Sequence, residues 1–181
     1  MGYVLLRSIR RERLPALTIN NIELDDTFYS HPKILVTALN GPAIRLSAAT
    51  VTHSDLIFAT PETYLLTLFA SLGLVTEGGT SVAFVRRELL QTRFVNQIAD
   101  TPKGDGAKFR EWVLWELESR VGDHLVKASI LEIKKLLREP GDHEFNDQAV
   151  KEFLGGLRKF ADGVPQAEFE KIASGMKKHK L

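Results

Sequence analysis

Forty consecutive residues, 46–85, contain no lysine or arginine. The chain as a whole carries 24 of these cations, so their absence is a property of this segment and not of the composition. The segment holds three acids, Asp55, Glu62 and Glu77, among many apolar, threonine, alanine and serine residues. Such a stretch is typical of a region that is buried or that faces a partner. The sequence therefore predicts a core or an interface at 46–85, between two more highly charged flanks.

The remaining composition excludes several classes of protein. With 44% hydrophobic and 26% charged residues in 181, the chain is not disordered, collagen-like or a coiled coil. It has no cysteine, which excludes disulfides and thiolate zinc sites, and its net charge of +1 creates no general attraction to nucleic acid or membranes. The apolar runs are too short for a signal peptide or a membrane span. We expect no membrane partner and a cytoplasmic location, with the nucleus not excluded.

The N-terminal residues, 1–29, are predicted to form a short β element. Residues 3–6 are a strand candidate, and residues 17–19 and 22–24 each alternate with a period of two. The doublet at 20–21 interrupts the alternation, which indicates a bulge or a tight turn.

Residues 30–100 are predicted to form a second module that begins with helices. Helix signals lie at 34–39, after Ser47, and at 61–72, where a threonine, a proline and an acid open the segment. A β-hairpin is predicted over 74–85, with its turn at Glu77-Gly78-Gly79-Thr80, and a further helix over 86–99. The run from Leu68 to Val75, followed by this turn, resembles the third helix and wing of winged-helix domains. No particular family is recognised.

Residues 107–181 are predicted to form a helical bundle. A glycine-rich loop at 101–106 separates them from the preceding module, and helices are expected around 109–117, 125–137, 147–160 and 164–176. The expected fold class is therefore α+β and mostly α: a small N-terminal β element, a winged-helix-like module and a C-terminal helical bundle.

One pattern suggests an enzyme. Glu132-Ile133-Lys134 resembles the Glu-x-Lys half of the PD-(D/E)xK nuclease family, which implies a metal held with Asp123 and with Glu116 or Glu118. The run 125–137 is, however, a good helix former, and two positions apart on a helix Glu132 and Lys134 diverge. We therefore expect both to be surface residues, and we predict no catalytic residue, no metal ligand and no cofactor.

The remaining candidates are binding residues. Cations that could contact phosphates are Arg7, Arg10, Arg11, Arg13, Arg86 and Arg87. Apolar side chains that could form an interface are Tyr64, Leu68, Phe69 and Trp115. From these features we expect a non-enzymatic binding or assembly protein. It would be a self-associating subunit of a larger complex that could also contain nucleic acid. A DNA- or RNA-binding regulator that uses the arginines, and the metal-dependent nuclease, remain alternatives.

Overall fold

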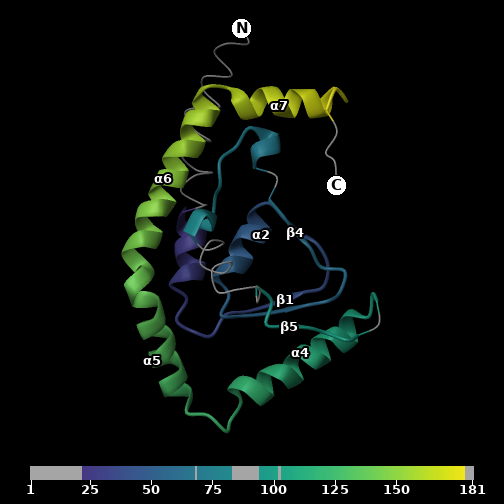
Figure 1. The fold of residues 1–181 in the computed structure, drawn as a ribbon, viewed down its shortest axis with the longest axis vertical. Helices are drawn as coiled ribbons and strands as arrows, with labels where there is room; N and C mark the ends of the chain where they lie inside the picture. Colours follow the sequence, from purple (N-terminus) through teal and green to yellow (C-terminus); the bar gives the residue numbers. More distant parts are fainter. Residues whose placement is uncertain (1–21, 68, 83–93, 102, 178–181) are drawn as a thin grey trace.

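The computed structural model describes residues 22–67, 69–82, 94–101 and 103–177, and the fold centres on two small parallel sheets (Figure 1). The first contains β1 (Val36–Leu39), β3 (Leu56–Ala59) and β5 (Gln97–Ile98), in the order β1-β3-β5. The second pairs β2 (Ala43–Ile44) with β4 (Leu65–Leu66). All three strand pairings are parallel, so the chain must cross back between paired strands.

Short helices make these crossings. A helical segment at 22–29 precedes β1. Between β2 and β3 lie α2 (Leu46–Thr50) and the 3-10 turn η1 (Val51–His53), and η2 (Ala70–Leu72) follows β4. Residues 80–82 are helical again.

The core is built on both faces of β3. Ile57 and Phe58 are adjacent in sequence, so their side chains point to opposite faces of the sheet, and both are fully buried. Ile57 packs in one apolar cluster with Leu39 and Val51. Phe58 packs in a second cluster, which includes Phe109 from the C-terminal half. A central strand that is covered on both faces explains the continuous apolar run Leu-Ile-Phe-Ala.

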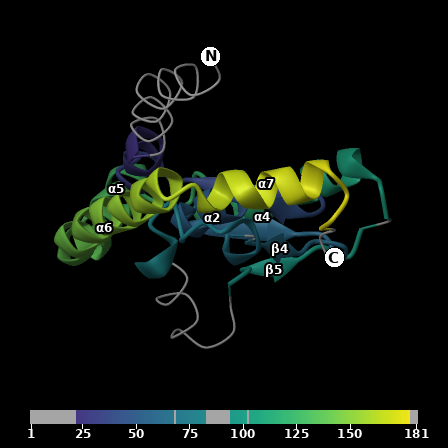
Figure 2. The same cartoon turned by 90° about the horizontal axis from the view of Figure 1, so that it is seen from above.

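Four long helices surround the sheets. They are α4 (Gly106–Val121), α5 (Lys127–Arg138), α6 (Asp142–Ala161) and α7 (Val164–Ala173), with the turn η3 (Glu139–Gly141) joining α5 to α6. In Figure 1, α5 and α6 follow an arc along one side of the strands, α7 crosses above them and α4 runs below them. The turned view in Figure 2 shows α5 and α6 at one end of the molecule, with the strands beyond them.

The sequence predicted these four helices, and the structure confirms them as helices, but they do not form a bundle. Apolar residues of α5 that a bundle would bury are largely exposed: Ile133 is 56% and Leu137 77% accessible. Instead, α4 packs Phe109 and Val113 against the strand residue Phe58. Helical periodicity locates an apolar stripe, and it does not identify the surface that the stripe covers.

The winged-helix prediction is wrong. The segment expected as its first helix, 34–39, forms β1, and the segment expected as its recognition helix, 61–72, contains β4 and η2. Over the described residues 74–82 the predicted hairpin is not formed, since residues 74–77 have no regular structure and 80–82 are helical. The predicted strand at 22–24 lies in a helix. Apolar runs this short fit either a strand or a helix, and here pairing with β3 decides the outcome. The predicted segment boundaries at 30, 100 and 107 stay predictions.

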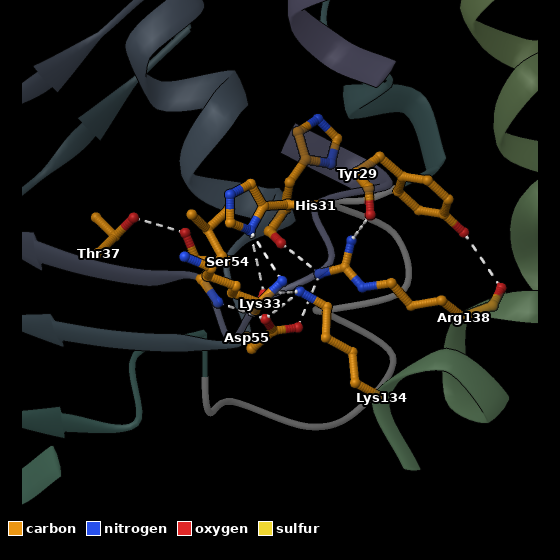
Figure 3. A network of polar contacts seen from close by, with 10 residues as sticks. Tyr29, His31, Lys33, Thr37, Ser54, Asp55, Lys134 and Arg138 are labelled. Carbon is orange, nitrogen blue, oxygen red and sulfur yellow. Dashed lines mark hydrogen bonds and ion pairs between the residues drawn. The ribbon is translucent and has the colours of Figure 1, made fainter. Parts of the chain in front are cut away.

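An ionic network attaches α5 to the start of β3 (Figure 3). Asp55 accepts a hydrogen bond of 2.7 Å from Lys134 Nζ and one of 2.9 Å from Arg138 Nη2. It also accepts the backbone N–H of Leu35, just before β1, at 2.7 Å. Burial alone would raise the pKa of Asp55, and these three donors together hold that pKa below its ordinary value.

Lys134 and Arg138 extend this network to other parts of the chain. Lys134 Nζ also donates to the Lys33 carbonyl, and Arg138 donates to the carbonyls of Tyr29 and His53. Lys134 is only 8% exposed, so the expectation that it is a surface residue is wrong, whereas Glu132 is exposed as expected. Along the described residues no helix is long and apolar enough to cross a membrane.

The network predicts a large difference between two neighbouring lysines. Lys134→Ala should lower the free energy of unfolding by about 2–3 kcal/mol, because it leaves the half-buried Asp55 carboxylate with one cation fewer. Lys135→Ala, at the next and exposed position of α5, should change it by less than about 0.5 kcal/mol. Urea denaturation of the two variants measures both values. Equal stabilities would contradict a structural role for the Lys134–Asp55 pair.

Candidate functional site

The structure describes only some of the residues that the sequence suggested as binding sites. All six arginine candidates, at 7, 10, 11, 13, 86 and 87, and the apolar candidate Leu68 lie outside the described residues. Tyr64 is 46% and Trp115 65% exposed, whereas Phe69 is 7% exposed and belongs to the core. The proposed interface therefore stays a prediction, and the clearest site of the described residues lies elsewhere.

That site is a loop with two glycines, residues 77–79, in the cation-free segment. Gly78 and Gly79 have φ angles of 80° and 64°, which L side chains rarely adopt. A Cβ at Gly78 would lie 2.7 Å from the Cβ of Ala49 in α2, and one at Gly79 would lie 2.2 Å from the Phe145 ring in α6. Only glycines let this loop pass between α2 and α6, and this passage places Glu77 at the junction.

Hydrogen bonds fix the loop from two sides. His53, in η1, makes a hydrogen bond of 2.8 Å through Nε2 with the Gly78 carbonyl oxygen. The two carboxylate oxygens of Glu152, in α6, accept the N–H groups of Gly79 at 2.9 Å and of Ser81 at 2.8 Å. The backbone around Glu77 is therefore held by side chains from two separate helical segments.

Three carboxyl groups meet here. Burial, followed by the negative charge of Glu152, raises the pKa of Glu77 above its ordinary value. Asp25, from helix 22–29, is 3% exposed, and burial together with the charges of Glu152 and Glu77 raises its pKa to about 7. Asp25 Oδ1 has no hydrogen-bond partner among the described residues. Carboxyl groups with raised pKa values in a part-buried cluster are typical of catalytic sites.

The first turn of α2 lies against the same loop. The Gly78 position is 3.8 Å from Leu46 Cδ1, measured from an ideal Cβ. The amides at the start of a helix have no acceptor within that helix, so the first N–H groups of α2 are free of intrahelical bonds. Arg45 precedes them with φ 61° and ψ −129°, the only positive φ of a non-glycine residue in the described ranges. Strained backbone of this kind is concentrated at functional sites.

Together these groups can do one kind of chemistry. A carboxyl that exchanges a proton near neutral pH can remove a proton from carbon, and backbone N–H groups nearby can stabilise the resulting negative charge. Within the described residues no group of three or more carboxylates and histidines has the arrangement of a metal site. Glu132, the acid of the Glu-x-Lys pattern, lies on helix α5 and not on a strand.

The sequence of His53, Ser54 and Asp55 resembles a catalytic triad in composition only. His53 contacts Gly78. Ser54 Oγ lies 2.5 Å from Thr37 Oγ1, and Asp55 pairs with Lys134 and Arg138 (Figure 3). The three side chains point to different partners, as expected for adjacent residues, and no nucleophile–base relay forms.

A cavity of about 600 Å³ lies elsewhere, between helix 22–29 and helices α5 and α6. Two of its cations, Lys134 and Arg138, are already engaged with Asp55 and with backbone carbonyls. Its other charges, such as Asp26, Lys135 and Glu139, have mixed signs. The cavity therefore offers no clear ligand chemistry.

Sequence reasoning missed Glu77 because it was interpreted as part of a hairpin turn. The available indication was an acid placed directly before two glycines in a segment without cations, where its charge has no neighbouring counter-ion. Asp25 and Glu152 lie 52 and 75 positions away from Glu77, and no local pattern connects them to it.

Comparisons with known proteins identify clear relatives. The chain is 46% identical to a Delta(3,5)-Delta(2,4)-dienoyl-CoA isomerase of Pyricularia oryzae, over 95% of this chain and 69% of that protein. It is 33% identical to a 3,2-trans-enoyl-CoA isomerase of Saccharomyces cerevisiae, over 89% of this chain and 64% of that protein. The chain thus spans about two thirds of the length of these relatives. No family model matches it.

Solved structures share the fold. An enoyl-CoA hydratase/isomerase from Pseudoalteromonas atlantica superposes with a TM-score of 0.73 at 19% identity, over 87% of this chain and 67% of that one. These findings overturn the expected winged-helix fold class. They also overturn the expected non-enzymatic, nucleic-acid-associated assembly protein and its two alternatives, the DNA- or RNA-binding regulator and the nuclease, because the relatives are isomerases of CoA thioesters. The expectations about partners and location stay predictions.

Asp25 predicts a pH dependence of stability. A carboxyl whose pKa is raised on folding stabilises the fold below its unfolded pKa of 3.8, and that contribution is lost as the pH rises to about 7. Asp25→Asn should therefore be more stable than the wild type at pH 8. Because one pKa unit corresponds to about 1.4 kcal/mol, the gain in the free energy of unfolding should be a few kcal/mol. The gain should shrink towards pH 4. Denaturation at several pH values measures it, with the exposed Asp26→Asn as a control. A gain independent of pH would contradict this assignment.

Arg45 predicts a stabilising substitution. Arg45→Gly should raise the free energy of unfolding by about 1 kcal/mol, since relief of about 1–3 kcal/mol of backbone strain exceeds the roughly 0.5–1 kcal/mol that glycine costs in chain entropy. Arg45→Ala is the matched control, because it removes the guanidinium and keeps the Cβ that causes the strain. Thermal and urea denaturation compare the two variants. Equal stability of the glycine and alanine variants would show that the backbone at Arg45 is unstrained.

Proposed function

Because the chain belongs to the enoyl-CoA hydratase/isomerase family, the crotonase superfamily, we propose that it moves a carbon–carbon double bond in an unsaturated acyl-CoA thioester. The names of its relatives support this reaction type, and they divide between enoyl-CoA and dienoyl-CoA isomerases. The observation that carries the proposal is the part-buried Glu77 carboxyl with its raised pKa, held at a double-glycine loop against the first turn of α2.

The proposed reaction transfers one proton and needs no cofactor. A base removes a proton from C2, beside the thioester carbonyl, and the electron pair spreads through the adjacent double bond onto the carbonyl oxygen. A proton then returns to C4 of a 3-enoyl substrate, or to C6 of a 3,5-dienoyl substrate. The double bonds end at C2, or at C2 and C4. No atom is gained or lost, so a single carboxyl can serve as both base and acid.

Glu77 suits this role for an energetic reason. A carboxylate with an ordinary pKa is a weak base towards a carbon acid, and one with a raised pKa binds the transferred proton more firmly. Burial and the charge of Glu152 both act in this direction on Glu77. After Glu77 has taken up the proton from C2, its neutral carboxyl is the acid that returns a proton to the substrate in the second step.

The first turn of α2 suits the other half of the reaction. Negative charge develops on the thioester oxygen when the C2 proton leaves. Unpaired backbone N–H groups in a buried setting stabilise such a charge, and their fixed positions avoid the cost of reorganising solvent. Leu46 and Ala49 of α2 pack beside the Gly78 position, so these amides lie close to the loop that carries Glu77.

Replacing Glu77 tests the proposal. Glu77→Gln keeps the size of the side chain and removes the proton-accepting group, so turnover of a 3-enoyl-CoA or of a 3,5-dienoyl-CoA should fall by about 10²–10⁴-fold. The gain in absorbance as the double bond becomes conjugated with the thioester measures the rate. In the wild type the rate should rise with pH through a midpoint above 4.5, the ordinary pKa of a glutamate, since the carboxylate is the active form.

Glu111→Gln is the matched control for Glu77→Gln. Glu111 is exposed on α4, so its substitution should leave the rate and the pH midpoint unchanged. A Glu77→Gln variant with wild-type turnover would contradict the assignment of Glu77 as the base. A wild-type protein that isomerises neither the 3-enoyl-CoA nor the 3,5-dienoyl-CoA would contradict the proposed function itself.

A further inference from the structure

Glu152 is a buried carboxylate far from Glu77 in sequence, with its two oxygens turned to the loop that carries Glu77. It is 8% exposed on α6, and it binds the N–H groups of Gly79 and Ser81, which lie 73 and 71 positions earlier in the chain. A carboxylate that accepts two backbone N–H groups makes charge-assisted hydrogen bonds, which are stronger than neutral ones. Glu152 therefore restrains both ends of the turn that follows Glu77.

Within the described part of the chain, Glu152 is bound by backbone amides and not by a cation. None of the ion pairs found among the described residues includes Glu152. Its partners are backbone amides, including those at the start of the helical residues 80–82, where the helix dipole is positive. Amides leave a net negative charge in place, and in a buried site this charge acts on its neighbours with little screening.

The titratable groups around the loop come from four elements. Glu77 lies on the loop itself, Asp25 on helix 22–29, His53 on η1 and Glu152 on α6. Glu152 contributes to the raised pKa of both Glu77 and Asp25. His53 makes a hydrogen bond through Nε2 with the Gly78 carbonyl oxygen.

We infer that Glu152 is a positioning residue for Glu77: it fixes the loop geometry through two hydrogen bonds and keeps a negative charge beside the base. This inference rests on the proposed function, and it adds a residue that touches neither the substrate nor the transferred proton. A residue with a purely structural role would leave the pKa of Glu77 unchanged when its charge is removed. Removal of the Glu152 charge should instead lower the pKa of Glu77 and make Glu77 a weaker base.

Two substitutions separate the charge from the geometry. Glu152→Gln keeps the length and one acceptor oxygen and removes the charge, so the acid limb of kcat/KM should move to lower pH by about one unit and kcat should fall several-fold, with KM nearly unchanged. Glu152→Asp keeps the charge on a shorter side chain, so its acid limb should stay near that of the wild type. Asp147→Asn, an exposed change on the same helix, is the control for removing one negative charge.

The pKa of Glu77 can also be measured without substrate. Carboxyl carbon NMR of glutamate-labelled protein follows its titration, with Glu77→Gln used to assign the signal. A lower Glu77 pKa in Glu152→Gln and an unchanged one in Glu152→Asp support the inference even if the wild type isomerises neither substrate. An unchanged Glu77 pKa and an unmoved acid limb in folded Glu152→Gln overturn it.

If Glu152→Gln does not fold, amide hydrogen exchange of the wild-type protein tests the inference instead. The amides of Gly79 and Ser81 should exchange slowly in the wild type, because Glu152 accepts both. Rapid exchange at these two amides would overturn the inference without any variant.

Discussion

The carboxylate of Asp55 is the point on which the described fold depends. It binds the backbone just before β1, stands at the start of β3, and pairs with Lys134 and Arg138 of α5. Arg138 also donates to the carbonyls of Tyr29 and His53, and these bonds attach helix 22–29 and η1 to α5. A charge at this depth is tolerable only because every contact is with a cation or an N–H group, and loss of one partner leaves a buried charge incompletely satisfied.

This network leads to the site through aromatic rings. Tyr29, under the Arg138 guanidinium, stacks on Phe145 with ring centroids 3.9 Å apart, and His53 meets both rings edge-on. Phe145 in turn packs so closely on Gly79 that no side chain fits there. The position of Glu77 therefore follows from packing among helix 22–29, η1 and α6, none of which is next to it in sequence. The site also carries an electrostatic cost, because burial and the negative charge of Glu152 act together on Glu77 and on Asp25 and raise the pKa of both carboxyls.

The sequence by itself determined the features that depend on local chemistry. The apolar stripes and caps of α4, α5, α6 and α7 predicted those helices, and the divergence of Glu132 from Lys134 followed from helix geometry alone. The segment without lysine or arginine marked the region that supplies β3, α2 and the Glu77 loop, although it was interpreted as an interface and a winged helix.

Tertiary structure decided the rest, because the decisive contacts join residues far apart. Val36–Leu39 is a strand only when β3 lies beside it, and a short apolar run carries no information about such a partner. Lys134 is buried because Asp55 lies 79 positions earlier, and Glu77 is a candidate base because Asp25 and Glu152 converge on its loop. A pKa depends on burial and on neighbouring charge, and both of these exist only after the chain has folded.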